Sequence, residues 1–475
     1  MGRDRQAGCR LHRRALPLLL AGIGGCTHVA PVPVHLEARI AGQAARTFDA
    51  PAAERDAALL APGAQAGRID RLTLFAALLA SDPRVAEARA ALETARRDAR
   101  SARKVGSPTL TLSSEYANDP STSSPWLLGG GVDLPLDIGG RRGARLARAD
   151  LGVIAARYDL AEVAWADRMA LVRALADHLI ARRQAELGTA IVAMRDRQLA
   201  VLEQRVARGE TAGLDLFPYR AQRAQAARAL EDAQRRAQQA RIAMAGVLGL
   251  PATALDGLDV AWDGFDAAST DAPALSPSVM ARAVAGRADV LKAIVAYDQA
   301  EADLRGELAR QYPAVSLGPG YTWERGLVKL PFAINLAVPS FDLNRAAIRA
   351  AEARRAQAGA AIETTLAQAQ AAIESARAER AAASAALDRV RRTELPQTAA
   401  VARRADAQLA KGTAGRADWA GAQIAALEAR LAEIDALARL RAADAALEDA
   451  LRQPLEGPET MIDRNRLVAV LEKQP

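Results

Sequence analysis

The chain has 475 residues, of which 50% are hydrophobic, 4% are aromatic and 116 are alanine. This composition excludes disorder, and it favours long helices over a compact β protein or a large α/β enzyme, whose cores need aromatic and β-branched residues. The formal charge of +7 includes +4 from residues 3–14, so residues 26–475 carry about +3, with basic and acidic residues interleaved. A nucleic-acid partner is therefore not expected, because it would need a concentrated basic face.

The N-terminus has the order of a secretion signal. Basic residues 3–14 precede an apolar run at 15–23, which is too short to span a bilayer, and two glycines and Cys26 follow. This arrangement resembles the lipobox of bacterial lipoproteins, which implies that residues 1–25 are removed and that Cys26 is acylated. Because Thr27 stands where an aspartate would signal the inner membrane, the resemblance implies the outer membrane. The alternative is an ordinary signal peptide with an incidental cysteine.

Segments of the chain recur at a nearly constant spacing. Residues 107–116 have a counterpart in residues 312–321, which lie 205 positions later. A second pair, 203 positions apart, is Arg208-Gly209 with Asp215 and Lys411-Gly412 with Asp418. Such a long and steady offset predicts two copies of one large unit rather than a solenoid of short repeats.

Each copy is expected to open with a moderate helix and then to form two β segments. The helices span 84–104 and 290–311, and a proline stops each of them. In the second copy, apolar residues at the even positions of 330–338 alternate strictly with smaller or polar residues, which predicts a strand. Residues 109–113 and 132–136 alternate in the same way, and β segments of about 8–11 residues, as expected here, suit tilted transmembrane strands.

A very long helix is predicted after each pair of β segments. These helices span 141–208 and 344–411, and about 68 residues correspond to about 100 Å at about 1.5 Å per residue. Return helices are expected at 214–248 and 417–451. Many positions on their seams are alanine, which lets helices approach closely and form thin walls instead of thick cores.

In their order and spacing, residues 70–452 resemble the outer-membrane efflux protein family, the TolC-like exit ducts. The segments that carry the resemblance are 133–143, which begins Asp-Leu-Pro-Leu-Asp, 338–345, 245–251 and the two glycine turns, each followed by an aspartate six residues later. The Gly-Gly-Arg-Arg turn at 139–142 is similar to the heavy-metal cation-efflux (CzcC-like) branch of that family.

The resemblance implies a mainly α fold with a small transmembrane β part. Four strands per chain are too few to close a barrel, so a homotrimer would form a 12-stranded β-barrel continuous with a 12-helix periplasmic α-barrel. The implied function is a passive outer-membrane duct that extends into the periplasm and is coupled through a periplasmic adaptor to an inner-membrane pump. The protein would then be no enzyme.

The expected domain limits follow from this scheme. Residues 42–74, 256–286 and 454–475 would belt the middle of the tunnel. The full series is a lipoprotein signal peptide (1–25), an N-terminal tether and equatorial segment (26–80), the first repeat (81–252), an inter-repeat equatorial segment (253–288), the second repeat (289–452) and a C-terminal equatorial tail (453–475).

The two glycine turns are the candidate functional residues. The resemblance implies that the adaptor contacts the tips formed by Gly209, Thr211, Gly213, Gly412, Thr413 and Gly415. It also implies a periplasmic gate at Asp418 and its first-copy equivalent Asp215, with Arg416 close enough to Asp418 to act as a closing latch. The alternatives are that these glycines are good turn formers and that the carboxylates stabilise the first turns of the return helices.

No cofactor or metal site is expected. Both cysteines precede residue 27, and His178, the one histidine in the repeats, has no second ligand within four residues. Two other readings stay open, a periplasmic adaptor lipoprotein and an outer-membrane duct for type I secretion, while a structural coiled coil would leave the strands unexplained. The residues do not distinguish metal ions, drugs and polypeptides as cargo.

Overall fold

The computed structural model describes residues 30–63, 67–116, 124–267, 276–324, 326–338 and 342–473. The chain divides into two compact units, residues 1–46 and 47–475. In the first unit, the described residues form one helix, α2 (Leu36–Ala44), none of whose side chains is buried. The predicted signal peptide and Cys26 lie outside the described residues, so both stay predictions.

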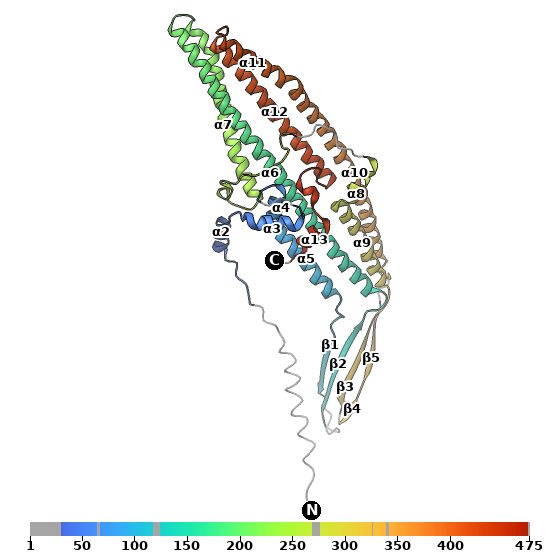
Figure 1. The fold of residues 1–475 in the computed structure, drawn as a ribbon. Coiled ribbons are helices and arrows are strands. Elements are labelled where there is room, and N and C mark those ends of the chain that lie inside the picture. The colour runs from blue at the N-terminus through green and yellow to red at the C-terminus, as the bar shows by residue number, and fades with distance from the viewer. Residues whose placement is uncertain are drawn as a thin grey trace, which may run out of the picture. The chain divides into compact units, whose positions relative to one another are not determined.

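The second unit holds the long helices, with the strands at one end of them and the glycine turns at the other (Figure 1). Its first half contains α3 (Ala50–Leu60), α4 (Arg71–Ser81), α5 (Pro83–Ala102), β1 (Thr109–Tyr116), β2 (Trp126–Leu136), α6 (Arg141–Ala207), the 3-10 helix η1 (Gly213–Leu216), α7 (Phe217–Val247) and the 3-10 helix η2 (Ala252–Leu255). Its second half contains α8 (Pro277–Ala285), α9 (Ala288–Ala309), β3 (Ala314–Glu324), β4 (Leu327–Lys329), β5 (Phe332–Ala337), α10 (Arg345–Arg389), the π-helix η3 (Val390–Glu394), α11 (Leu395–Ala410), α12 (Arg416–Leu451), the 3-10 helix η4 (Pro458–Met461) and α13 (Arg464–Glu472).

Side chains in the sequence set the starts of the helices around the middle of this unit. Asp70 accepts a hydrogen bond from the backbone N–H of Thr73 at 2.9 Å and caps α4. Asp82 caps α5 by accepting from the N–H of Arg84 at 2.7 Å, and Pro83 occupies the first turn, where its missing N–H is harmless. These two caps place a sharp corner between α4 and α5.

The first long helix forms as the sequence predicts, but the second does not run unbroken. Helix α6 has 67 residues, a length of about 100 Å. The helix expected at 344–411 is divided into α10 and α11 by the π-helix η3. Pro396 explains the break, because it lacks an N–H and its ring collides with the carbonyl one turn earlier, so the preceding turn widens.

The two hairpins join into one five-stranded antiparallel sheet. Strands β1 and β2 pair, β2 pairs with β3, and both β4 and β5 pair with β3. The strand predicted at 330–338 is confirmed as β5, which starts two residues later than the pattern. Pro331 cannot donate a ladder hydrogen bond, and it lies between the short strand β4 and β5. Its carbonyl still accepts from the N–H of Gly320 at 2.8 Å, which keeps the two short strands in line.

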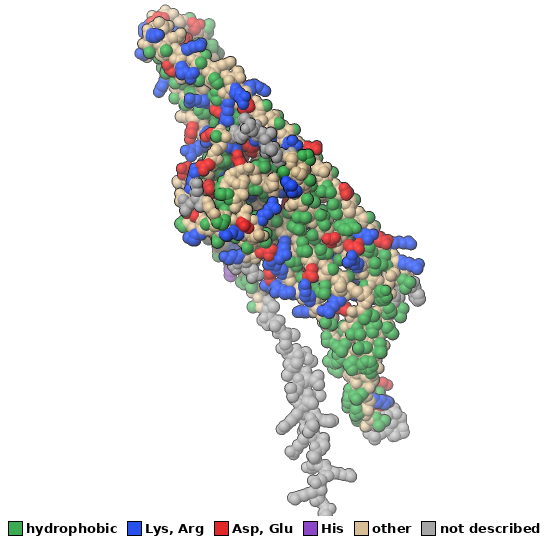
Figure 2. Space-filling view, turned by 45° about the vertical axis from the view of Figure 1, so that its right-hand side comes forward, with side chains coloured by type: hydrophobic (Ala, Val, Ile, Leu, Met, Phe, Trp, Pro, Cys, Tyr) green, Lys and Arg blue, Asp and Glu red, His purple; other side chains and the backbone are tan. Residues whose placement is uncertain are grey.

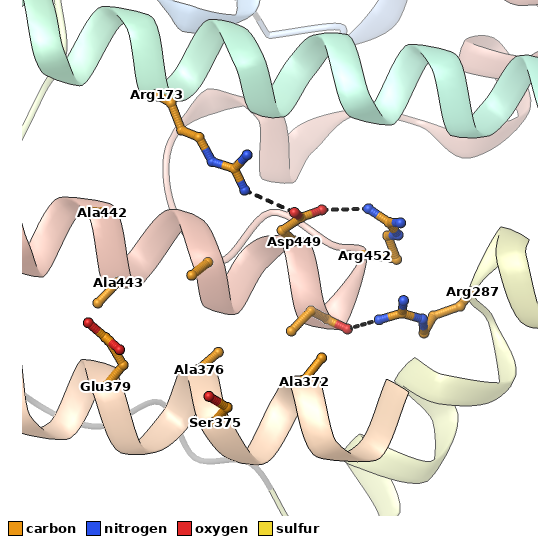
Figure 3. A pocket seen from close by; sticks show the side chains of 12 residues that line it. Arg173, Arg287, Ala372, Ser375, Ala376, Glu379, Ala442, Ala443, Asp449 and Arg452 are labelled. Atoms are coloured by element: carbon orange, nitrogen blue, oxygen red, sulfur yellow. Dashed lines mark hydrogen bonds and ion pairs between the residues drawn. The ribbon is translucent and has the colours of Figure 1, made fainter. Parts of the chain in front are cut away.

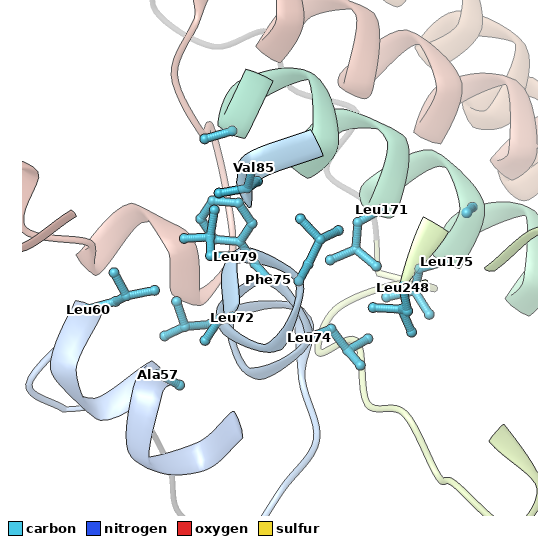
Figure 4. Packing of buried hydrophobic residues seen from close by; sticks show 14 of the residues in the cluster. Ala57, Leu60, Leu72, Leu74, Phe75, Leu79, Val85, Leu171, Leu175 and Leu248 are labelled. Atoms are coloured by element: carbon cyan, nitrogen blue, oxygen red, sulfur yellow. The ribbon is translucent and has the colours of Figure 1, made fainter. Parts of the chain in front are cut away.

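The largest hydrophobic core lies beside the middle of α6, where α4 packs (Figure 4). Each fully buried leucine there contributes about 1.5–3 kcal/mol. The residues that meet are Leu72, Leu74, Phe75, Leu78 and Leu79 of α4, Val85 of α5, Leu60 of α3, Leu171 and Leu175 of α6, and Leu248. Elsewhere the helices pair through alanine-rich seams. Among the described residues, no helix has a stretch that is both long and apolar enough to cross a membrane.

Chain segments that are far apart in sequence meet around this core. Ile69 forms a parallel bridge with Val260, and Arg68 forms an ion pair with Asp263. The N–H of Asp463 donates to the carbonyl of Leu60 at 3.2 Å. Within residues 47–475, three segments thus lie together: the one before the first half, the one between the halves and the C-terminal one. The predicted domain limits themselves stay predictions.

A buried arginine ties these segments to the helices. Arg441 of α12 donates to the carbonyls of Gly264 and Phe265 at 2.6 and 2.8 Å, and it forms an ion pair with Glu456 at 2.5 Å. Its guanidinium also lies 5.3 Å from the ring centroid of Trp262. Burial lowers the pKa of Arg441, although Glu456 and Asp444 oppose the effect. The inter-half segment is therefore fixed against α12 by hydrogen bonds as well as by packing.

Candidate functional site: a two-faced sheet and two glycine turns

The pairing register sorts the side chains of the sheet onto two faces of opposite character. In antiparallel strands, directly paired residues point to the same side and alternate residues to opposite sides. Leu134 pairs with Leu317, which pairs in turn with Ile334. The residues that share this apolar face are Leu110, Leu112, Val132, Leu134, Leu136, Val315, Leu317, Tyr321, Phe332, Ile334 and Leu336.

The apolar face is exposed to its surroundings. Leu112 leaves 76% of its surface uncovered, and seven more of these side chains are more than 40% exposed. Hydrophobic side chains dominate the visible surface over the strands (Figure 2). Tyr116 and Trp126 stack edge to face at its loop end, with ring centroids 5.1 Å apart. A large exposed apolar face with an aromatic border is suited to lipid.

The opposite face carries small and polar side chains. Thr109, Thr111 and Ser113 lie on it in β1, and glycines lie on it in β2 and β3. In its middle, Asp133 accepts hydrogen bonds from Ser316 Oγ and Asn335 Nδ2, each at 2.9 Å. Such a face is suited to water rather than to hydrocarbon.

Both edges of the sheet are open. Strand β1 pairs only with β2, and β4 and β5 pair only with β3, in the part of the sheet that the structure describes. Unpaired backbone groups cannot lie in a bilayer core, where each would cost several kcal/mol. A sheet with one lipid-suited face would need further strands at both edges, which the described residues of this chain do not supply.

At the other end of the helices, the two glycine turns have the same backbone geometry. Gly209 and Gly412 adopt left-handed φ angles of 75° and 68°. After Gly209, the N–H of Glu210 donates to the carbonyl of Arg205 at 2.9 Å. After Gly412, the N–H of Thr413 donates to the carbonyl of Gln408, also at 2.9 Å. Both are Schellman caps, in which a side chain at the glycine would strain the backbone.

The remaining predicted tip residues lie on the exposed turns. Thr211 and Gly213 are exposed, and Gly213 opens η1. The hydroxyl of Thr413 also donates a hydrogen bond to the carbonyl of Gln408, at 3.1 Å. Gly415 is the N-cap of α12 and is partly covered. The turns are therefore accessible surfaces on rigidly capped helix ends.

The structure places Asp418 beside a residue that the sequence did not indicate. Asp418 lies in the first turn of α12, and a Cβ on Gly415 would meet its Oδ2 at 2.9 Å and the Nη2 of Arg205 at 2.7 Å. No ion pair joins Arg416 and Asp418 in the described residues, since residues two apart on a helix point to different sides, and the latch stays a prediction. No signal in the sequence could have linked Arg205 to a residue more than two hundred positions away.

Asp215 lies in the first turn of η1 and is exposed. Several turns before the tip, Arg195 of α6 joins three helices, because its Nη1 donates to Gln222 of α7 at 2.6 Å and its Nη2 forms an ion pair with Glu428 of α12 at 3.0 Å. Gln198 adds a hydrogen bond to the carbonyl of Ala417 at 3.3 Å. Arg195 therefore fastens the α11–α12 hairpin to the α6–α7 hairpin below the tips.

A cavity of about 400 Å³ between α6, α10 and α12 is lined by arginines that are already partnered and by Glu379 (Figure 3). Arg173 and Arg452 both bind the carboxylate of Asp449, at 2.9 and 2.5 Å. Arg287 is held by Asp289 at 2.6 Å and by the carbonyl of Ala450. These arginines therefore link the helices around the cavity by ion pairs and hydrogen bonds, and they are not available to a ligand.

Burial raises the pKa of several carboxyl groups, among them Asp167 and the partly buried Asp444. Burial, reinforced by the nearby carboxylate of Asp82, raises the pKa of Asp167 to about 6, and Arg84 opposes the effect. Burial likewise raises the pKa of Asp444 to about 6, against the opposing charges of Arg380 and Arg441. Both groups lie among the helices at a distance in sequence from strands and tips, and they bear on stability.

The described residues contain no group of three or more histidine, cysteine, aspartate or glutamate side chains that could hold a metal ion. His178 is half-buried, and burial together with Arg182 and Arg241 lowers its pKa. The candidate functional surfaces are therefore the sheet and the tips.

Comparison with known proteins agrees with this geometry. The family described as outer membrane efflux protein matches residues 74–250 and 279–451. The fold is similar to VceC of Vibrio cholerae, with 20% identity over 81% of this chain and 97% of that one and a TM-score of 0.65. It is also similar to the CmeC outer membrane channel of Campylobacter jejuni (14% identity, 85% and 89% coverage, TM-score 0.66) and to MtrE of Neisseria gonorrhoeae in its open state (18%, 82% and 89%, 0.63). No curated protein matches the chain.

Proposed function

The chain belongs to the outer membrane efflux protein family, and from that premise we propose that it is the exit duct of a tripartite efflux system. Members of this family are outer-membrane efflux channels and not enzymes. In the proposed system, three copies of the chain form a passive, water-filled duct. A periplasmic adaptor couples the duct to an inner-membrane pump, which supplies the energy.

The observation that carries this proposal is the two-faced sheet with two open edges. Twelve strands from three chains would satisfy every edge, turn the apolar face outward to lipid and turn the polar face inward to water. The long helices that continue from β2 and β5 would then surround a tunnel of about 100 Å. The recurrence of segments 107–116 and 312–321 supports a duplicated unit, so that each chain contributes two equivalent parts of the wall.

The tip residues are the proposed contact for the adaptor. Gly209, Thr211, Gly213, Gly412, Thr413 and Gly415 lie on the two exposed turns or at the helix start beside them, at the end farthest from the sheet. We place the gate at Asp418, Arg416 and Asp215, with Arg205 as a further cation near Asp418. Opening would then require the α11–α12 hairpin to part from α6, against the fastening by Arg195.

Two finer assignments rest on the sequence. Acylation of Cys26 would anchor the chain to outer-membrane lipid and rests on the lipobox resemblance. Membership in the heavy-metal cation branch rests on the turn at 139–142. The adaptor and type I secretion readings are alternatives, and the two separate long hairpins, α6–α7 and α11–α12, favour a duct over an adaptor, which needs only one.

Imaging of the detergent-extracted protein, with a mass determination, tests the duct directly. A trimeric hollow cylinder with a tunnel of about 100 Å is expected, as the helix lengths require. A monomeric solid rod that leaves the membrane without detergent would refute the duct and favour the adaptor reading.

A matched pair of substitutions tests which face of the sheet meets lipid. Leu112→Arg places a charge on the apolar face and should reduce outer-membrane insertion, because arginine in the bilayer middle costs about 2–4 kcal/mol. Thr111→Arg, one residue away on the polar face, should insert normally. Insertion is measured as heat-resistant trimer in outer-membrane fractions, and equal loss in both variants would contradict the assignment of the faces.

A further inference from the structure

The polar face of the sheet carries a carboxylate that the proposed function does not require. We propose that Asp133 is a cation-selecting residue of the membrane-embedded part of the duct, distinct from the aspartates at the tips. The inference rests on the proposed function, because it needs a water-filled lumen lined by this face. The ligand class is a hydrated cation in passage, attracted by three copies of the carboxylate at one level.

Asp133 is held by donors from two other strands. The register that pairs Gly131 with Gly320 and Leu134 with Leu317 sets Asp133 opposite Gly318. Its Oδ2 accepts from Ser316 of β3 and its Oδ1 from Asn335 of β5, at 2.9 Å each. The carboxylate reaches past β3 to β5 over Gly318, where a Cβ would lie in ordinary van der Waals contact, 3.6 Å from Oδ1.

The charge of Asp133 is not neutralised within the described chain. Its two donors are a neutral hydroxyl and a neutral amide, and no lysine or arginine forms an ion pair with it. Glu324 and Lys329, near the loop end of the same face, neutralise one another. At the helix end, Arg145 is occupied by Asp137 at 2.7 Å. Asp133 is therefore a fixed negative charge among uncharged side chains.

The alternation of the strand excludes a lipid-facing position for this group. Val132 and Leu134, its two neighbours, lie on the apolar face, so Asp133 must point to the other side. Neighbouring polar-face residues are small, among them Gly131, Gly318 and Ala333, and they leave room for water and ions above the carboxylate. Serine and asparagine fix its position without masking its charge.

The expected effect follows from simple electrostatics. Three carboxylates about 10 Å from the axis of a water-filled lumen, with screening over about 10 Å, should enrich a monovalent cation about twofold and deplete an anion about twofold. The permeability ratio of potassium to chloride should therefore fall about fourfold when the three charges are removed.

The test measures reversal potentials of the full-length trimer in planar bilayers under a potassium chloride gradient. Asp133→Asn keeps the size and the hydrogen-bonding shape of the side chain and should lower the potassium-to-chloride ratio about fourfold. Asp150→Asn, which removes a carboxylate from a surface ion pair on α6, is the matched control and should leave the ratio unchanged. A trimeric, conducting Asp133→Asn channel with the wild-type ratio would overturn the inference.

A second variant uses the absence of cysteine after residue 26. In Asp133→Cys, a negatively charged methanethiosulfonate reagent should attach through a disulfide and restore cation preference, and a positively charged one should favour anions. A thiol that neither reagent reaches in the conducting trimer would place residue 133 away from water and refute the proposal. A wild-type trimer that forms no channel at all would instead refute the duct, and this inference with it.

Discussion

Replacing Asp167 by asparagine should stabilise the protein near neutral pH and leave its stability in acid unchanged. The side chain of Asp167 is 1% exposed and forms an ion pair with Arg84 at 2.6 Å. Arg84 also binds Asp82 at 3.1 Å, so one guanidinium serves two buried carboxyl groups. Asparagine at 167 removes the second negative charge, can donate to Asp82, and leaves the Arg84–Asp82 pair in place.

The magnitude follows from the raised pKa of Asp167. Burial, with the charge of Asp82, raises this pKa from 3.8 to about 6. At about 1.4 kcal/mol per pH unit, ionising the group in the folded state costs about 3 kcal/mol of stability above pH 6. Because the folded state holds the proton more tightly than the unfolded chain, stability is full below pH 4 and falls as the pH rises towards 6.

The assay compares unfolding of wild-type and Asp167→Asn protein in detergent by tryptophan fluorescence, from about pH 4 to about pH 8. The free energy of unfolding of the variant should exceed that of the wild type most at the alkaline end and not at all at the acidic end. Asp150→Asn, at a half-exposed carboxylate, should show no such trend. An equal gain at both ends would show that proton binding is not the cause. A loss at pH 8 would show that the Arg84–Asp167 pair outweighs the burial of the charge.

At the tips, Gly412→Ala should lower the stability of the turn by about 1 kcal/mol, because the left-handed backbone disfavours a Cβ. Faster amide hydrogen exchange in the turn would report this loss. Gly143→Ala, in open space on α6, should instead stabilise by a similar amount, and the opposite ranking would contradict the reasoning. Asp418→Ala should lower cation selectivity in single-channel recordings, and an unchanged cation-to-anion permeability ratio would show that Asp418 is not part of the gate. Arg195→Ala should raise the resting conductance because it unfastens the two hairpins, whereas Arg182→Ala, in a surface i,i+4 pair, should not.

The sequence by itself determined the elements whose periodicity is strong. The alternation at 109–113, 132–136 and 330–338 predicted strands, and the alanine-rich stretches predicted helices within a few residues of their ends. Glycine at 209 and 412 identified both turns, because a left-handed helix cap has few other occupants. Local chemistry was sufficient in each of these cases.

Proline was the local feature whose effect the sequence reading underestimated. Pro331 delays the start of the strand predicted at 330–338 to Phe332 and separates it from β4, and Pro396 divides one predicted helix at η3. In both cases the missing N–H removes a backbone hydrogen bond that the hydrophobic pattern by itself does not reveal.

Only the tertiary structure decided which distant residues meet. The pairing of β2 with β3 brings Asp133 to Ser316 and Asn335, and the packing of α6 against α12 brings Arg205 to Asp418. These partners lie from 183 to 213 positions apart in the chain. Their contacts depend on strand register and helix packing, which a one-residue shift would change, and no local pattern in a single sequence specifies them.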